Sequence, residues 1–324
     1  MPIVDPRRGM GVGFMVRQVA ATGSKQWMAH MAGSNGHAPN DEADIIPRDI
    51  RFGILGNATR HWYGGDIHKT LMADGLSIFL PEGERYFIRS LKHYASKLGD
   101  RELAEEINGY SVQEAYHTRE HEDYNRAMAS LGYDVEEMEK PVKAALGVTK
   151  NPLHRLAVTC AIEHLTATLS SVTLRRPEIF DGAAAPYRRL WMWHALEELE
   201  HKAVALDVLK AVTPNLAGWK RYLLRVSAMN ATIVPFLFIF LRNTRLYAHT
   251  DGVKTGPRFW LRFLWVVAVA PGFWRRCFPL FLSYYLPGFD PKNSDDAELV
   301  RKGRAWLEQE MPPASGPVPS GSAG

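Results

Sequence analysis

The stretch from Arg189 to Asp207 constrains the fold of this chain more than any other. Its sequence, RLWMWHALEELEHKAVALD, has good helix formers and neither Pro nor Gly, and it predicts one long α-helix. Helical periodicity places His194, Glu198 and His201 on the same face. Their neighbours are apolar, and acidic or imidazole groups that face a core cost free energy unless a partner compensates them. A metal ion is such a partner, and a single helix cannot complete its coordination shell.

The rest of the chain is long enough to supply the missing ligands. Its 324 residues, 46% of them apolar, allow one large domain or two ordinary ones with a sizeable core. Cys160 and Cys277 lie far apart and outside any CxxC spacing, which argues against a disulfide framework or a thiolate zinc site. The N-terminal segment lacks the uninterrupted apolar run of an export signal. We therefore expect a cytoplasmic protein.

A helix that opens with LPEGERYF carries Glu82 and Glu84 in its first turn. Acidic residues are common there because they interact favourably with the helix dipole. Considered alone, Glu84 is best interpreted as a solvated end residue. Only the arrangement of the other helices gives it a different role.

The segment Asn108 to Ala129 predicts a helix that contains Glu114 and His117 in ExxH spacing, with His121 one turn later. All three lie on one face. The arrangement mirrors that of the 189–207 helix, in which a histidine precedes ExxH.

The segment Leu156 to Leu174 is uncharged except at Glu163 and His164, and a helix that is apolar all round is buried. A glutamate in its middle needs an ion pair or a metal as a partner. His164 lies roughly 100° further around the helix, and we expect it to make a neighbouring hydrogen bond.

Taken together, the four predicted helices present carboxylates and imidazoles in the order E, ExxH, E, ExxH. This is the ligand set of ferritin-like four-helix bundles with a dimetal carboxylate centre. We therefore predict an all-α fold with such a bundle; the alternative is an ordinary helical protein with internal ion pairs. The predicted metal ligands are Glu84, Glu114, His117, Glu163, Glu198 and His201.

Four segments of the chain also resemble a known bacterial family, the predicted metal-dependent hydrolases. They are LPEGERYF at 80–87, QEAYHTREHEDYN at 113–125, IEHLTA at 162–167 and WMWHALEELEHKAVALDV at 191–208. The similarity extends from about Ile45 to Pro287. It implies an all-helical metalloprotein in which the six residues above are the ligands, and it leaves the reaction open.

The ligand chemistry favours iron or manganese. Four carboxylates and two imidazoles form a hard, anionic shell, and we expect two metal ions, with iron favoured and manganese or zinc as alternatives. Such a centre suits an O2-dependent oxidase or hydroxylase that needs an electron donor, with Glu114 and Glu198 as catalytic residues. The alternatives are metal-dependent hydrolysis of an ester or amide, and a metal-binding bundle without catalysis.

Five further side chains are candidates for an extra ligand or for positioning a ligand. His121 and His194 can each enter the shell as an additional imidazole or orient a ligand by a hydrogen bond. Glu197 lies within one turn of both histidines of its helix, although only Glu198 completes ExxH. Glu82 and His164 complete this set.

The C-terminal third combines basic and apolar residues. Between Gly218 and Phe289 there are ten Lys or Arg and a single acidic residue, Asp251. The apolar runs at 226–241, 263–274 and 277–289 fall short of the ~20 residues of a spanning helix, and prolines interrupt them. This composition is typical of a segment that lies on an anionic membrane surface; further core helices and a spanning hairpin are the alternatives.

The sequence divides into four parts. We expect a flexible leader at 1–44, a helical metal-binding bundle at 45–215, the basic and apolar helical segment at 216–290, and a terminal helix with a disordered tail at 291–324. A small hydrophobic substrate such as a lipid is the expected ligand of the bundle. If the C-terminal segment lies on a membrane surface, we expect this cytoplasmic protein at the inner face of the cytoplasmic membrane. Basic residues set among Phe, Leu and Trp argue against nucleic-acid binding.

Overall fold

The computed structural model describes residues 44–311, and those residues form an all-α protein, as the sequence predicts. Within that range the only β-type pairing is a single bridge between Tyr63 and Ala183. The expected leader up to 43 and the tail from 312 lie outside the described residues. The α-helices are α2 (Ile67–Ser77), α3 (Leu80–Ala95), α4 (Arg101–Ser130), α5 (Val135–Gly147), α6 (Pro152–Arg175), α7 (Ala185–His201), α8 (Val204–Val212), α9 (Gly218–Thr250), α10 (Pro257–Ala268), α11 (Phe273–Ser283) and α12 (Ala297–Glu310).

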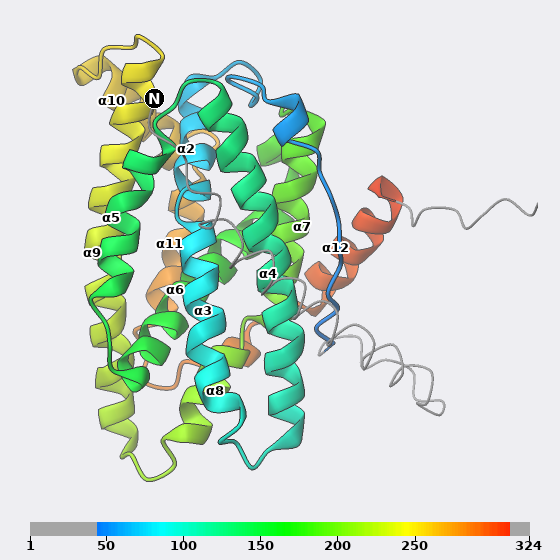
Figure 1. Cartoon of the computed structure of the whole chain (residues 1–324), viewed down its shortest axis with the longest axis vertical. Coiled ribbons are helices and arrows are strands. Elements are labelled where there is room, and N and C mark those ends of the chain that lie inside the picture. Colours follow the sequence, from blue (N-terminus) through cyan, green and yellow to red (C-terminus); the bar gives the residue numbers. More distant parts are fainter. Residues whose placement is uncertain (1–43, 312–324) are drawn as a thin grey trace, which may run out of the picture.

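Helices α3, α4, α6 and α7 pack together and form the part of the bundle that positions the candidate site. They run along the long axis of the molecule, as Figure 1 shows. Local sequence fixes where they begin: the carboxylate of Asp100 accepts from Leu103 N at the start of α4, and the Asn151 side chain accepts from Leu153 N at the start of α6. Pro81 occupies the first turn of α3, where its missing N–H costs nothing.

The helix predicted from Arg189 to Asp207 is interrupted. Helix α7 ends at His201, and α8 begins at Val204 after a turn at Lys202. The Lys202 ammonium lies 2.8 Å from the carboxylate of Asp296 in a distant segment. A tertiary ion pair at the turn is invisible to local sequence, which contains neither Pro nor Gly here.

Helix α9 also differs from the prediction, because the apolar run at 226–241, which Pro235 was expected to interrupt, is part of one continuous helix. Gly218–Thr250 contains Pro235 in its interior. Proline removes one backbone donor, but packing of α9 against α6, α2 and α5 holds both halves in line. Gly75 lets α2 approach α9 closely, because a Cβ at this position would lie only 2.9 Å from the ring of Phe240.

The segment from Asp44 to Asn57 forms no strand; it lies along the bundle and ends in a short 3-10 helix, Leu55–Asn57. Its aromatic residue Phe52 packs on Trp193 with ring centroids 5.2 Å apart. The segment thereby covers α7 near the site.

Candidate metal centre

Six buried side chains from α3, α4, α6 and α7 converge at one place in the bundle. They are the six residues that the sequence predicts as ligands, and each is at most 1% exposed: Glu84, Glu114, His117, Glu163, Glu198 and His201. Each ExxH pair comes from one helix, α4 or α7, and each single glutamate from α3 or α6. The fold thus brings together residues that are more than 100 positions apart along the chain.

Glu114 and Glu198 lie at the centre of this cluster. His201 Nε2 is 3.1 Å from Glu114 Oε1, 3.5 Å from Glu198 Oε2 and 3.6 Å from Glu163 Oε2. On the other side, His117 Nδ1 is 3.9 Å from an oxygen of Glu114 and 3.9 Å from an oxygen of Glu198. The two central carboxylates therefore face an imidazole on each side, which is an arrangement that can bridge two cations.

Many polar atoms of the cluster lack hydrogen bonds. Buried groups without partners are rare in folded proteins because each costs on the order of 1–3 kcal/mol. Among the described residues, eight atoms of the six side chains have no hydrogen-bond partner: both carboxylate oxygens of Glu84 and of Glu114, Nδ1 of His117, Oε2 of Glu163, Oε2 of Glu198 and Nε2 of His201. A bound cation would satisfy these oxygens and nitrogens together, so the residues fit a metal.

Burial determines the charge that these groups carry without a cation. It raises the pKa of Glu84 and of Glu114 well above the ordinary value, and the neighbouring Glu198 carboxylate adds to the effect. Burial also raises the pKa of Glu163, to about 8, and lowers the pKa of His117 well below its usual range. These shifts disfavour the ionised forms of Glu84, Glu114 and Glu163, and a positive charge beside the three carboxylates would favour those forms.

A hydrogen bond to Gln113 fixes the orientation of His201. The Gln113 amide nitrogen donates to Glu200 Oε2 at 2.8 Å, so the amide oxygen is left as the acceptor of His201 Nδ1 at 3.0 Å. The proton of a neutral His201 is therefore on Nδ1. The lone pair of Nε2 points at carboxylate oxygens, an orientation that suits a metal ligand.

Glu197 fixes the other imidazole from outside the cluster. His117 Nε2 donates to Glu197 Oε2 at 3.1 Å, and the second oxygen of Glu197 accepts from Trp193 Nε1 at 3.0 Å and from Arg48 at 3.1 Å. His117 Nδ1 is left facing the centre. Glu197 is thus a partner of His117 and Arg48, and its carboxylate does not share the central position of Glu198.

His194 and His121 extend the cluster in a chain of hydrogen bonds. His194 Nε2 is 2.9 Å from Glu198 Oε1, and its Nδ1 is 2.9 Å from His121 Nε2. The other nitrogen of His121 is 3.0 Å from the hydroxyl of Ser77, which donates to Asn125. Nitrogen and oxygen atoms of Glu84, His121 and His194 also lie within 4.8 Å of one another, so both histidines are within reach of a cation.

Two of the sequence candidates lie away from the cluster. Glu82 projects from the first turn of α3 toward the surface, 22% exposed, and pairs with Arg85 and Lys143. His164 is on the far side of α6, where its Nε2 donates to the carbonyl of Leu280 at 3.0 Å. The neighbouring positions Glu84 and Glu163 face inward instead, because one or two residues along a helix rotate a side chain to another face.

Sequence reasoning missed three residues that support the site: Arg48, Gln113 and Tyr110. Tyr110 donates to Glu163 Oε1 and lies one turn before Glu114 on α4. Its position on the same helix face as Glu114 could therefore have predicted that it lies near the site. Gln113 precedes Glu114 but gives no pattern of its own. Arg48 lies in an irregular segment, 149 residues from its partner Glu197, and nothing local indicates that contact.

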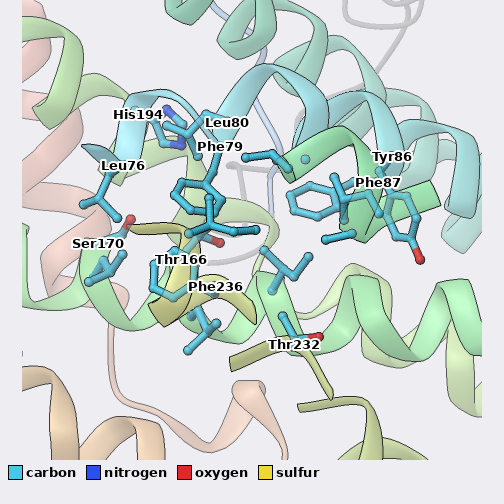
Figure 2. A pocket seen from close by; sticks show the side chains of 18 of the residues that line it. Leu76, Phe79, Leu80, Tyr86, Phe87, Thr166, Ser170, His194, Thr232 and Phe236 are labelled. Carbon is cyan, nitrogen blue, oxygen red and sulfur yellow. The ribbon is translucent and has the colours of Figure 1, made fainter. Parts of the chain in front are cut away.

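An apolar cavity of ≈ 380 Å³ adjoins the cluster. His194 lines it, together with residues next to the candidate ligands in sequence, namely Gly83 and Ile162. Figure 2 shows His194 and Leu80 at one side of this cavity and residues of α9 at the opposite side, among them Phe236 and Thr232. Its lining is mainly aliphatic and aromatic, so an occupant would be mostly hydrocarbon.

Comparison with known proteins gives one family. A family model described as predicted metal-dependent hydrolase matches residues 46–295, which is more than half of the chain. No curated protein and no solved structure matches the chain.

Proposed function

The chain belongs to the predicted metal-dependent hydrolase family, and from this membership together with its buried cluster we propose that it hydrolyses an ester or amide that carries a long apolar group. The observation that carries the proposal is the position of His194. Its imidazole lies 2.9 Å from Glu198 and also lines the apolar cavity. A substrate chain in the cavity would therefore bring its polar end to the cluster.

The six converging side chains are the proposed metal ligands, and Glu114 and Glu198 at their centre would hold the metal together with the imidazoles of His117 and His201. A divalent metal ion here would lower the pKa of a coordinated water and polarise a carbonyl oxygen. The protein contributes fixed ligand orientations, through Glu197 for His117 and Gln113 for His201. It also excludes bulk water, because Trp193 packs edge-on against the His117 ring at 4.7 Å.

Two glutamates in the same turn of α3 allow a matched test. Glu84→Gln removes an inward-facing candidate ligand, and Glu82→Gln removes a surface carboxylate. We expect Glu84→Gln to lose bound metal in elemental analysis and to lose hydrolysis of 4-nitrophenyl esters of long fatty acids. Glu82→Gln should retain both. Equal metal content and equal turnover in the two variants would refute the proposed centre.

A second candidate is O2-dependent oxidation of a hydrophobic substrate, which the carboxylate-rich ligand set favours. Hard oxygen ligands with a few imidazoles suit iron, and the E, ExxH, E, ExxH order is that of dimetal carboxylate bundles. This activity would need an electron donor. Loading the protein with Fe(II) without O2 and then admitting O2 separates the two functions, since oxidation consumes O2 with the substrate whereas hydrolysis proceeds equally well without it.

A further inference from the structure

Helices α9, α10 and α11 present an apolar surface to solvent. Among residues 44–311, every exposed large apolar side chain except Leu55 and Val148 lies on this face or at its ends. Scattered apolar residues are ordinary on a protein surface, but a contiguous group marks an interaction site. The exposed residues of this apolar face are Trp219, Leu223, Val234, Leu237, Phe238, Leu241, Leu261, Leu264, Trp265, Val269, Phe278, Leu282 and Leu286.

Helix α10 illustrates why the bundle alone does not explain this pattern. Its inner stripe is apolar, with Phe259 and Phe263 buried. Its outer side carries large apolar residues beside the exposed Arg258 and Arg262, with Leu261 67% exposed, Leu264 56% exposed and Trp265 50% exposed. A helix that lies on a protein in water normally has a polar outer stripe, so α10 lacks a partner on that side.

Aromatic contacts join the three helices into one layer. The ring of Trp274 on α11 lies 5.7 Å from that of Phe240 and 6.0 Å from that of Phe236, both on α9. Phe240 also contacts Phe263 of α10, with centroids 6.3 Å apart. In Figure 1, α9 runs along one side of the molecule with α10 beside its C-terminal end. The exposed apolar side chains therefore lie on three helices that pack as one layer.

This face is also positively charged. Arg245, Lys254, Arg258 and Arg275 are exposed on it, and within residues 44–311 none of these four makes an ion pair. The single acidic residue of the segment, Asp251, does not offset them, because its side chain is 3% exposed and pairs with His61 at 2.9 Å. Apolar side chains rimmed by unpaired cations complement a membrane surface that has anionic head groups.

We infer that the α9–α11 face docks on an anionic phospholipid bilayer. Two like-charged copies of the face would repel each other, which argues against a second copy of the chain as the partner. Docking also fits better than crossing the membrane. Helix α9 is long and apolar enough to span a bilayer, but its inner side is fixed to the bundle, where the Asn243 amide donates to the carbonyl of Met138 at 3.2 Å.

The face is continuous with the apolar cavity. Ala231, Thr232 and Phe236 of α9 line the cavity, whereas Val234 and Leu237, on the same turns, are exposed on the apolar face. A docked molecule would hold this wall of the cavity against the lipid. The bilayer would then supply the substrate whose hydrocarbon group enters the cavity. This source of substrate rests on the proposed function, whereas docking itself does not.

Vesicle flotation of the full chain tests the docking. The probes are vesicles of phosphatidylcholine alone and of phosphatidylcholine mixed with phosphatidylglycerol. We expect binding to the anionic vesicles that weakens as salt is added. Leu237→Glu combined with Phe238→Glu should abolish it, and Lys254→Gln combined with Arg258→Gln should weaken it about twenty-five-fold, from roughly fivefold for each cation lost.

Matched controls separate docking from misfolding and from nonspecific charge effects. Leu55→Glu replaces an exposed apolar residue elsewhere, and Arg301→Gln removes an exposed cation of α12. Both should bind vesicles as the parent does, and circular dichroism should show equal helix content in all variants. Lipids with brominated chains should quench the tryptophan fluorescence of the parent. The quenching should be smaller in Trp265→Phe and unchanged in Trp306→Phe.

Three results would overturn the inference. One is that the protein binds neither kind of vesicle. Another is that the double variant Leu237→Glu, Phe238→Glu binds vesicles as well as Leu55→Glu does. The third is a dimer in sedimentation equilibrium that Leu237→Glu dissociates, which would assign the face to a second copy. Vesicle binding needs no metal and no turnover, so its failure leaves the hydrolase proposal to its own test.

Discussion

His117 Nε2 lies 3.1 Å from Glu197 Oε2, and this contact gives two adjacent glutamates of α7 different positions. Glu197 is held outside the cluster by Arg48 and Trp193, whereas Glu198 lies at its centre. Neighbouring carboxylates with the same burial therefore provide a natural comparison. One orients an imidazole, and the other is a proposed ligand.

Replacing these glutamates one at a time should separate the two positions. Glu198→Gln removes a proposed ligand, and we expect the protein to lose its bound metal. Glu197→Gln keeps a side chain that accepts from His117, so metal should remain, with affinity lowered roughly 10–100-fold as for other partners of metal ligands. Competition with a chromophoric chelator measures both affinities. Equal losses in the two variants would contradict the distinction drawn from the structure.

Metal binding should also stabilise the fold. The eight unpaired polar atoms of the cluster gain partners only when a cation is present. At a free metal concentration of about 100 times Kd, binding adds roughly 2.7 kcal/mol to the free energy of unfolding. The melting temperature of the parent should therefore rise on addition of iron, manganese or zinc, and that of Glu84→Gln should rise much less. A rise of the same size in Glu84→Gln would show that the stabilising ion binds elsewhere.

Asp74 predicts a pH dependence that is separate from the cluster. Its Oδ1 accepts from Tyr124 at 2.6 Å and from Trp62 at 2.9 Å, and burial raises its pKa from 3.8 to about 7 although both hydrogen bonds lower it. Between those two values the folded protein keeps a proton that the unfolded chain has lost. The contribution of Asp74 to the free energy of unfolding is therefore greatest below pH 3.8. It decreases as the pH rises from 3.8 to about 7.

Asp74→Asn should remove this contribution, because an amide keeps the acceptor oxygen and does not ionise. Urea unfolding in the presence of a chelator, at about pH 5 and about pH 8, gives the measurement. We expect the parent to lose more stability than the variant between the two pH values. The same loss in both proteins would mean that Asp74 titrates normally.

The helical class and the set of candidate ligands could both be predicted from the sequence, because buried polar residues need partners. Glu163 in an otherwise uncharged helix needs a partner, and the ExxH spacing places Glu114 and His117 on one face. The turn at Lys202 escaped prediction because its contact is with Asp296. Helix α9 continues through Pro235 because of tertiary packing, which cannot be predicted from the periodicity of the sequence. The ferritin-like arrangement of the bundle stays a prediction.

Residues that support the candidate ligands were harder to find than the candidate ligands themselves. The candidate ligands are polar groups in apolar helices, whereas Arg48 is an ordinary cation in an irregular segment. Its function follows only from its contacts of 3.1 Å with Glu197 and 2.7 Å with Glu200. Glu82 was a wrong candidate. It is only two residues from Glu84 in the sequence, but its side chain faces solvent.

Filling the cavity from α9 should change which substrates are accepted. Thr232 lines the cavity on the side opposite His194, as Figure 2 shows, so an indole at this position would occupy space proposed for the far end of an acyl chain. We expect Thr232→Trp to lower kcat/KM for long-chain esters by about tenfold or more and to leave short-chain esters nearly unchanged, because each methylene of buried chain contributes roughly 0.8 kcal/mol. Thr250→Trp, at the exposed end of the same helix, is the matched control and should leave the chain-length profile as it is. A profile that shifts equally in both variants, or in neither, would mean that the substrate chain lies outside this cavity.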